Sequence, residues 1–254
     1  MSDSASTPAG IIFGATGGIG SILARRLSAA GWRLALSARE RERLETLAKE
    51  LSAHAEAADA TNAKSVENVF AAAYEKVGRV GGVVNCCGSL LLKPAHLTSE
   101  EEWVHTLNSN LTTAFHVLRG AVSRMMRNGG GSIVLLSSAV AQRGMINHEA
   151  IAAAKAGVVG LAQSAAATYA RYNIRVNCVA PGLTRTPLTE PLTKNEASLK
   201  ASAALHPLGR IGEPHEVASA IAWLLDPEQS WVTGQVIAVD GGLSSVQART
   251  PLSA

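Results

Sequence analysis

Short apolar runs alternate with longer segments of helical periodicity along most of the chain. Short apolar runs bounded by turn-forming residues are typical of buried strands, and apolar positions three and four residues apart mark one face of a helix. The pattern predicts strands at residues 11–13, 33–37, 54–58, 82–85, 133–136, 174–179 and 236–239. It predicts helices at residues 19–30, 41–51, 62–77, 99–127 and 149–171, with more helix after a loop that contains Pro181, Pro187 and Pro191.

Regular alternation of strands and helices indicates repeated βαβ units, which build a parallel sheet covered by helices on both faces. We therefore expect an α/β fold, a three-layer doubly wound parallel sheet in a single domain. A chain of 254 residues suits one such domain. The domain is predicted over residues 9–243, with a flexible N-terminus at 1–8 and a C-terminal tail at 244–254. Residues 182–207 are the least regular part, and the pattern fits either a substrate lid or a long connection.

Composition narrows the range of partners. Hydrophobic residues make up 47% of the chain and the formal net charge is only +3, with basic residues scattered. A nucleic-acid-binding surface is not expected, because such surfaces concentrate Lys and Arg. Three cysteines suggest neither a disulfide framework nor a metal site. The N-terminus lacks the pattern of a signal peptide, and no apolar run approaches the ~20 residues that span a bilayer. The sequence thus predicts a cytoplasmic protein without a membrane partner.

A glycine-rich turn joins the first predicted strand to the first predicted helix. Glycines at 14, 17, 18 and 20 surround Thr16 and Ile19. Such a turn allows the backbone to approach a pyrophosphate, and the helix N-terminus then offers free N–H groups to the anion. We predict that Gly14, Thr16, Gly18, Ile19 and Gly20 bind a dinucleotide.

The end of the second predicted strand distinguishes the two nicotinamide cofactors. An NAD site usually has Asp or Glu there to bind the ribose hydroxyls, whereas this chain has Ala38 followed by Arg39. A guanidinium can pair with the 2′-phosphate of NADP. NADP(H) is therefore favoured over NAD(H). The alternative is that Arg39 is an ordinary surface residue among glutamates.

Further motifs follow the glycine turn in one order: Asp59-Ala60-Thr61, Asn85 with Gly88, Asn110, Ser138, and Arg175-Val176-Asn177 through Ala180-Pro181-Gly182. Together they resemble the motifs of the short-chain dehydrogenase/reductase family, with the layout of its 3-oxoacyl carrier-protein reductases. The resemblance implies a Rossmann fold and an NAD(P)-dependent oxidoreductase whose substrate is a small carbonyl compound or alcohol. It also implies homo-oligomerisation, as a dimer or tetramer, through the alanine-rich helix predicted at 149–171. By the same resemblance, further cofactor contacts come from Asp59, Ala60, Asn85, Gly88, Lys155, Pro181, Gly182 and Thr184.

The family's catalytic groups are matched except for one. Asn110 matches the residue of the proton-relay water chain, Ser138 the residue that orients the substrate, and Lys155 the lysine of a Tyr-x-x-x-Lys motif. The position of the tyrosine, 151, holds isoleucine. Isoleucine has no proton to donate, and a general acid of this kind typically contributes ~10²–10⁴ in rate.

Three interpretations of Ile151 follow. Another group could replace the tyrosine, and His148 is the first candidate because residues 148, 151 and 155 share a helix face; Glu149 is a second. Alternatively, Lys155 or a water bound to Ser138 supplies the proton, or the substrate needs none. In the third interpretation the chain binds NADP(H) without turnover, as a sensor or partner subunit. The leading hypothesis is an atypical NADP(H)-linked oxidoreductase, and the alternative is the catalytically silent binder.

Overall fold

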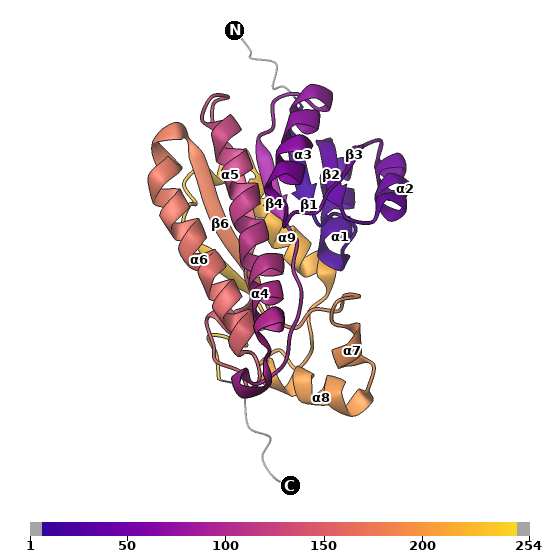
Figure 1. Ribbon diagram of the computed structural model, residues 1–254, viewed down its shortest axis with the longest axis vertical. Coiled ribbons are helices and arrows are strands. Elements are labelled where there is room, and N and C mark those ends of the chain that lie inside the picture. Colours follow the sequence, from indigo (N-terminus) through magenta and orange to yellow (C-terminus); the bar gives the residue numbers. More distant parts are fainter. Residues whose placement is uncertain (1–6, 248–254) are drawn as a thin grey trace.

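A seven-stranded parallel sheet forms the centre of the molecule in the computed structural model, which describes residues 7–247 (Figure 1). The strand order is β3-β2-β1-β4-β5-β6-β7. All neighbouring strands are parallel. This confirms the predicted doubly wound α/β fold. The strands are β1 (Ala9–Phe13), β2 (Arg33–Ala38), β3 (His54–Ala57), β4 (Gly82–Asn85), β5 (Gly131–Leu136), β6 (Ile174–Pro181) and β7 (Val236–Val239).

Helices cover both faces of the sheet. One face packs against α3 (Ala63–Lys76), α5 (Thr113–Met125) and α6 (Glu149–Tyr169), and the other against α1 (Gly18–Ala29), α2 (Arg41–Leu51) and α9 (Pro214–Leu225). Strands in such a sheet are buried on both faces, which is why they read as continuous apolar runs. Wherever bounds were predicted for a strand or helix, they agree with the observed ones to within two residues.

The helix predicted at 99–127 is interrupted. Helix α4 (Glu100–Leu107) begins with a capping box between Ser99 and Glu102, continues into one π-helical turn at Asn108–Thr112, and leads into α5. A π turn adds one residue and shifts the phase of the apolar pattern, but the pattern on each side of the turn is still helical, so the periodicity did not reveal it. Such turns occur often at functional sites, and this one contains Asn110.

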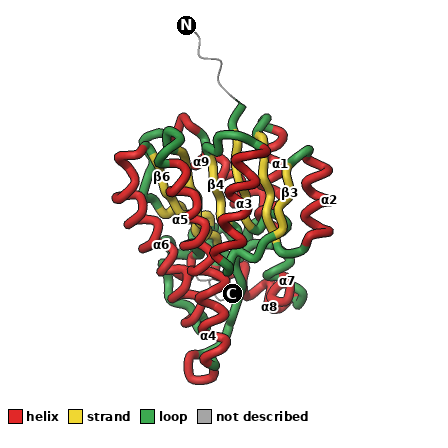
Figure 2. The backbone as a smooth tube through the Cα atoms, turned by 45° about the horizontal axis from the view of Figure 1, so that its top comes forward, coloured by secondary structure: helices red, strands yellow, loops and turns green. Residues whose placement is uncertain are grey.

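The irregular segment 182–207 contains two short helices, α7 (Glu190–Thr193) and α8 (Glu196–Leu205). Neither helix has a buried residue. Both lie beyond the end of the sheet at which the strands finish, away from the layers that cover its faces (Figures 1 and 2). The segment is therefore positioned beside the region where ligands of doubly wound sheets bind.

The composition of helix α6 bears on the expectation that no apolar run reaches the length of a membrane span. Helix α6 and the turn after it, Glu149–Tyr172, reach a mean hydropathy of 1.3 over an 18-residue window, which meets a length and composition criterion for a membrane span. The hydropathy comes from the many alanines together with Ile151, Val158, Val159 and Leu161. Of that window, 44% is buried against the rest of the chain. This is weak evidence for a span, because a core helix meets the same criterion. Most of the two predicted terminal tails lies outside the described residues.

Candidate functional site

A cavity of about 750 Å³ lies along the carboxyl ends of β1, β2, β4, β5 and β6. Between β1 and β4 the chain order of the strands reverses, because β1 pairs with β2 on one side and with β4 on the other. Ligands of open parallel sheets bind in the crevice outside such a reversal. The lining includes both the glycine-rich turn and the residues expected to do chemistry.

The glycine turn has the close packing that a dinucleotide cradle requires. A Cβ on Gly20 would lie 2.3 Å from the carbonyl oxygen of Gly14, so only glycine fits there. The N-cap of α1, Gly17, offers no side-chain cap, and no acidic residue occupies the first turn. The N–H groups of that turn therefore remain available for an anion, and the positive end of the helix dipole favours one. The residues present fit a pyrophosphate.

Polar groups line the end of the cavity where β2 and β3 finish. The hydroxyl of Ser37 is buried, lines the cavity and has no hydrogen-bond partner within the described structure. A buried orphan hydroxyl is costly unless something pairs with it. Arg39 and Arg43 also line this end, and the Arg43 guanidinium donates to the Thr16 carbonyl at 3.2 Å. Two guanidinium groups and an unpaired hydroxyl suit the ribose and a phosphate attached to it.

Asp59 lies beside these groups. Its Oδ1 accepts the Thr61 backbone N–H at 2.9 Å and the Thr61 hydroxyl at 2.8 Å. These bonds, the backbone one foremost, together with the charge of Arg39, hold the pKa of Asp59 below its ordinary value. Asp59 is thus a fixed carboxylate at the cavity wall, next to Ala60.

The predicted cofactor contacts lie on the wall of this cavity with one exception. Asn85, 2% exposed, does not line it. Its side-chain oxygen accepts the Cys87 backbone N–H at 3.2 Å, and its amide donates to Thr113 at 3.4 Å. Asn85 thereby fixes the segment after β4 from its buried side, through the bond to Cys87. The predicted cofactor contacts that do line the wall are Gly14, Thr16, Gly18, Ile19, Gly20, Arg39, Asp59, Ala60, Gly88, Lys155, Pro181, Gly182 and Thr184.

Asn110 and Lys155 meet at the opposite end of the cavity. A Cβ placed on Gly88 would lie 2.9 Å from Asn110 Oδ1 and 3.5 Å from Lys155 Nζ, so the three residues converge. Lys155 Nζ donates to the Leu136 carbonyl at 2.9 Å. Burial lowers the pKa of Lys155 to about 8, because a charged ammonium is poorly solvated there. The Asn110 amide donates to the Thr106 carbonyl at 2.9 Å, which fixes it within the π turn.

Ser138 follows β5 on the same wall. Its hydroxyl lies 3.5 Å from the Pro181 carbonyl and 3.4 Å from the Val140 backbone N–H. Both distances are long for hydrogen bonds to a hydroxyl, so Ser138 remains able to bond a ligand in the cavity.

Ile151 and His148 complete this end. Ile151 is 3% exposed and lines the cavity with Ser138 and Lys155. His148 is the N-cap residue of α6, one position before the helix proper, and it also lines the cavity. Its Nδ1 lies 2.6 Å from the Ile146 carbonyl, which requires a proton on Nδ1 and leaves Nε2 without a protein partner within residues 7–247. Glu149 is exposed and does not line the cavity.

Three thiols surround Lys155 without serving as thiolates. Burial raises the pKa of Cys87 and Cys178 to about 12 and raises that of Cys86 further. Thiols with raised pKa values are poor nucleophiles. They act as small packing residues, which was the expectation for Cys86 and Cys87.

The rest of the wall at the Ser138 end is mostly apolar. Side chains come from the segment after β4, the segment before α6 and the segment around α7 and α8. They include Leu90, Leu92, Met145, Leu183, Leu188, Leu192 and Leu205. An apolar wall with a few convergent polar groups is typical of a site for a small organic ligand.

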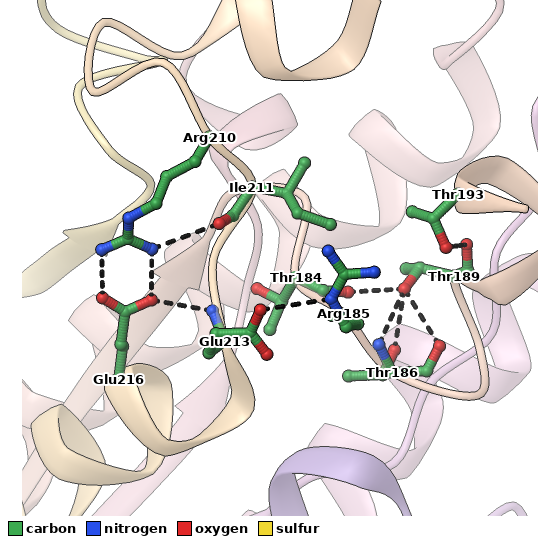
Figure 3. A network of polar contacts seen from close by, with 9 residues as sticks. All are labelled: Thr184, Arg185, Thr186, Thr189, Thr193, Arg210, Ile211, Glu213 and Glu216. Atoms are coloured by element: carbon green, nitrogen blue, oxygen red, sulfur yellow. Dashed lines mark hydrogen bonds and ion pairs between the residues drawn. The ribbon is translucent and has the colours of Figure 1, made fainter. Parts of the chain in front are cut away.

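Hydrogen bonds fold the loop after Thr184 into a compact unit (Figure 3). The Thr189 hydroxyl accepts the Thr186 backbone N–H at 3.1 Å and donates to the Thr184 carbonyl. Arg185 pairs with Glu213 at 3.2 Å, and Arg210 forms a two-pronged pair with Glu216. These contacts join the loop to the start of α9.

Among the residues of the cavity wall that sequence reasoning did not identify are Ser37, Arg43 and His206. Arg43 lies four residues after Arg39, a spacing that would have allowed a second guanidinium on the same side. Nothing local in the sequence marks Ser37 or His206, because their positions depend on contacts with distant segments.

Comparisons with known proteins agree with this geometry. A family model described as enoyl-(acyl carrier protein) reductase matches residues 14–244. The 3-oxoacyl-acyl-carrier-protein reductase FabG of Thermotoga maritima is 37% identical over 240 residues, 92% of this chain and 96% of that protein. The human 3-oxoacyl-acyl-carrier-protein reductase is 36% identical over 92% of this chain and 97% of its own length. A short-chain type dehydrogenase/reductase of Mycobacterium ulcerans superposes with a TM-score of 0.91 at 33% identity, over 95% of this chain and 91% of that one.

The chain belongs to the short-chain dehydrogenase/reductase family. The expected relationship is therefore confirmed, and the relatives of this chain are oxidoreductases of that family. A variant of actinorhodin polyketide ketoreductase, solved with NADPH, has a TM-score of 0.90 at 31% identity, over 94% of this chain and 98% of that chain.

Proposed function

We propose that the chain is an NADP(H)-linked oxidoreductase that interconverts a carbonyl compound and an alcohol, with a proton route that does not use tyrosine. One observation carries the proposal: a single cavity joins a dinucleotide cradle to Asn110, Ser138 and Lys155. The names of its relatives, 3-oxoacyl reductases and a ketoreductase with NADPH, support ketone reduction as the reaction class.

The cofactor would occupy the cavity with its pyrophosphate at the start of α1. Arg39 and Arg43 would face the 2′-phosphate of the adenosine ribose, and Asp59 with Ala60 the adenine. Lys155 would bind the hydroxyls of the nicotinamide ribose, since its ammonium lies beside Gly88 and Asn110. When bound, the nicotinamide supplies or accepts the hydride, and the protein orients the substrate against it.

Ile151 would occupy the position of the family's tyrosine. It precedes Lys155 by one helical turn of α6 and lines the cavity together with Ser138 and Lys155. Its side chain fills space and excludes water but cannot transfer a proton. Ser138 would still hold the substrate oxygen by its free hydroxyl.

Two groups on the wall have the chemistry to replace the tyrosine. Nε2 of His148 has no partner among the described residues, and an imidazole nitrogen can donate or accept a proton. Lys155, with a pKa of about 8, is still protonated at neutral pH and releases its proton in mild alkali. If Lys155 is the donor, the rate of carbonyl reduction falls as pH rises through about 8.

A second candidate function rests on Ile151 itself. A family member with a complete cofactor cradle and no tyrosine would bind NADP(H) without turnover, as a sensor or a partner subunit. The same wall of Ser138 and Lys155 would then bind a ligand without converting it.

The deciding experiment follows NADPH oxidation on a panel of ketones, diketones and quinones. The first candidate predicts turnover, with a ~10²-fold or larger loss in His148→Ala if His148 donates the proton. His96→Ala is the matched control, since His96 is exposed and lies off the cavity wall. Turnover that His148→Ala leaves intact, with an alkaline limb near pH 8, would assign the proton to Lys155. Cofactor binding without turnover on any substrate would favour the silent binder.

We also propose that the chain forms a homo-oligomer. Val104 on α4 and Phe115 on α5 are large apolar side chains that are 43% and 45% exposed, and α6 exposes alanines and glycine nearby. Burying such a surface against a second copy would be favourable. Light scattering of the purified chain tests this: a dimer or tetramer is expected, and a monomer at micromolar concentration would contradict it.

A further inference from the structure

The cavity wall formed by α7 and α8 is held to the rest of the molecule unusually loosely. No residue between Arg185 and Leu205 is buried, although Ser198, Ser202 and Leu205 line the cavity. On the side of Thr184, the hydrogen bonds around Thr189 secure the loop (Figure 3). On the other side, the first buried residue is His206, immediately after α8, which is only 3% exposed.

Both ring nitrogens of His206 are engaged. Nδ1 lies 2.8 Å from the Ser202 carbonyl in the last turn of α8, and Nε2 lies 3.2 Å from the backbone nitrogen of Leu183. A carbonyl only accepts and an amide only donates, so Nδ1 must carry the proton and Nε2 must accept. The neutral imidazole with this one tautomer satisfies both partners. The ring therefore links α8 to the backbone that follows β6.

The backbone that His206 reaches is closely fitted to it. A Cβ on Gly182 would lie 2.8 Å from His206 Nε2 and 2.9 Å from Asp240 Cα. The absence of a side chain at Gly182 is thus what allows the imidazole to reach Leu183. Pro181, Gly182 and Thr184 lie on the wall of the same cavity, so the link joins two walls, one on the cofactor side and one on the substrate side.

We propose that His206 is a positioning residue, whose neutral imidazole couples the α8 wall of the substrate cavity to the Gly182–Leu183 backbone. The role in catalysis rests on the proposed function, but the link itself does not. Without the imidazole, α8 would retain no buried anchor on its C-terminal side before Ile211, and the Leu183 N–H would lose its partner. The two walls would then open independently.

Hydrogen exchange of the full chain tests the link without requiring turnover. In His206→Leu, we expect the Leu183 amide and the amides of α8 to exchange about tenfold faster, the scale of one lost hydrogen bond. His206→Gln should restore much of the protection, because a side-chain amide both donates and accepts. His215→Leu, an exposed histidine on α9, should leave the segment unchanged. Unchanged exchange in His206→Leu, or equal loss in His206→Gln, would overturn the proposal.

The unmodified protein offers a check that does not depend on how the variants fold. The ¹⁵N shifts of the His206 ring should show a protonated Nδ1 and an unprotonated Nε2 at neutral pH. The opposite tautomer or a charged ring would overturn the link. If the chain turns over, His206→Leu should raise KM for the carbonyl substrate at least fivefold while changing the Kd of NADPH less than twofold. A failure of turnover leaves the exchange test intact and counts against the proposed function alone.

Discussion

The two ends of the cavity are built in different ways. The cofactor end consists largely of backbone: a glycine turn, the free N–H groups of α1 and the ends of β1 and β2, with Arg39 and Asp59 at the margin. The Ser138 end depends on single side chains, each with its own supporting bonds. Ile151 lies at that end and has no proton to donate, and the glycine turn lies at the other end.

The difference teaches that binding and chemistry can diverge separately in this fold. A cradle made of backbone tolerates change in the side chains around it, whereas a proton donor is one atom on one residue. Ile151 is 3% exposed and packs into the wall, so a side chain without a proton to donate fits there. The two ends therefore respond differently to substitution.

The largest effect should come from restoring the hydroxyl at the Ser138 end. Ile151→Tyr is expected to create or raise NADPH-dependent carbonyl reduction by ~10²–10⁴, the usual contribution of a general acid. The assay is NADPH oxidation on simple ketones. Ile151→Phe controls for size, since it adds a ring without a hydroxyl. Equal rates in the two variants, with both folded and both binding NADPH, would show that the cavity has diverged beyond residue 151.

Disrupting the glycine turn at the cofactor end should have the second-largest effect, a loss of NADPH affinity. In Gly20→Ala the new Cβ would meet the Gly14 carbonyl at 2.3 Å, so the turn must shift. We expect NADPH affinity to fall at least ~100-fold, because the cradle depends on close backbone approach. Calorimetry measures it, and circular dichroism verifies the fold. Gly160→Ala is the matched control, because a Cβ there meets nothing within 4 Å. Wild-type NADPH affinity in Gly20→Ala would show that the glycine turn does not bind the cofactor.

A smaller effect, at Arg39, should distinguish the binding of NADPH from the binding of NADH. Arg39→Ala is expected to weaken NADPH binding about tenfold or more, the scale of a charge-assisted contact to phosphate, and to change NADH binding less than about threefold. Arg41→Ala, on the same segment but off the cavity wall and paired with Glu45, serves as control. Equal losses of affinity for NADPH and NADH would mean that Arg39 does not bind the 2′-phosphate.

The smallest effect should come from Ser37. Its buried hydroxyl lacks a partner in the described structure, so Ser37→Ala should leave the melting temperature of the free protein unchanged or higher. NADPH affinity should fall about threefold. Ser132→Ala is the contrast, because that buried hydroxyl donates to the Leu224 carbonyl at 2.8 Å and its loss should lower stability by about 1 kcal/mol. Lower stability in Ser37→Ala would indicate a partner for the hydroxyl in the free protein.

The sheet could be predicted from the sequence because parallel strands buried on both faces, such as β1 and β5, leave continuous apolar runs. The glycine turn could be predicted because its chemistry is local. The π turn around Asn110 could not, since the pattern on each side of the one inserted residue is still helical. His206 could not either, because its link to Leu183 spans 23 residues of sequence and arises only in the folded chain.

Titration calorimetry of the unmodified chain with NADPH and with NADH tests the central claim most directly, because that claim is a complete NADP(H) cradle beside an absent tyrosine. The account predicts that NADPH binds, and binds more tightly than NADH, whether or not any substrate turns over. Absence of binding by either cofactor would contradict it, and tighter binding of NADH would overturn the assignment of Arg39 and Arg43 to the 2′-phosphate.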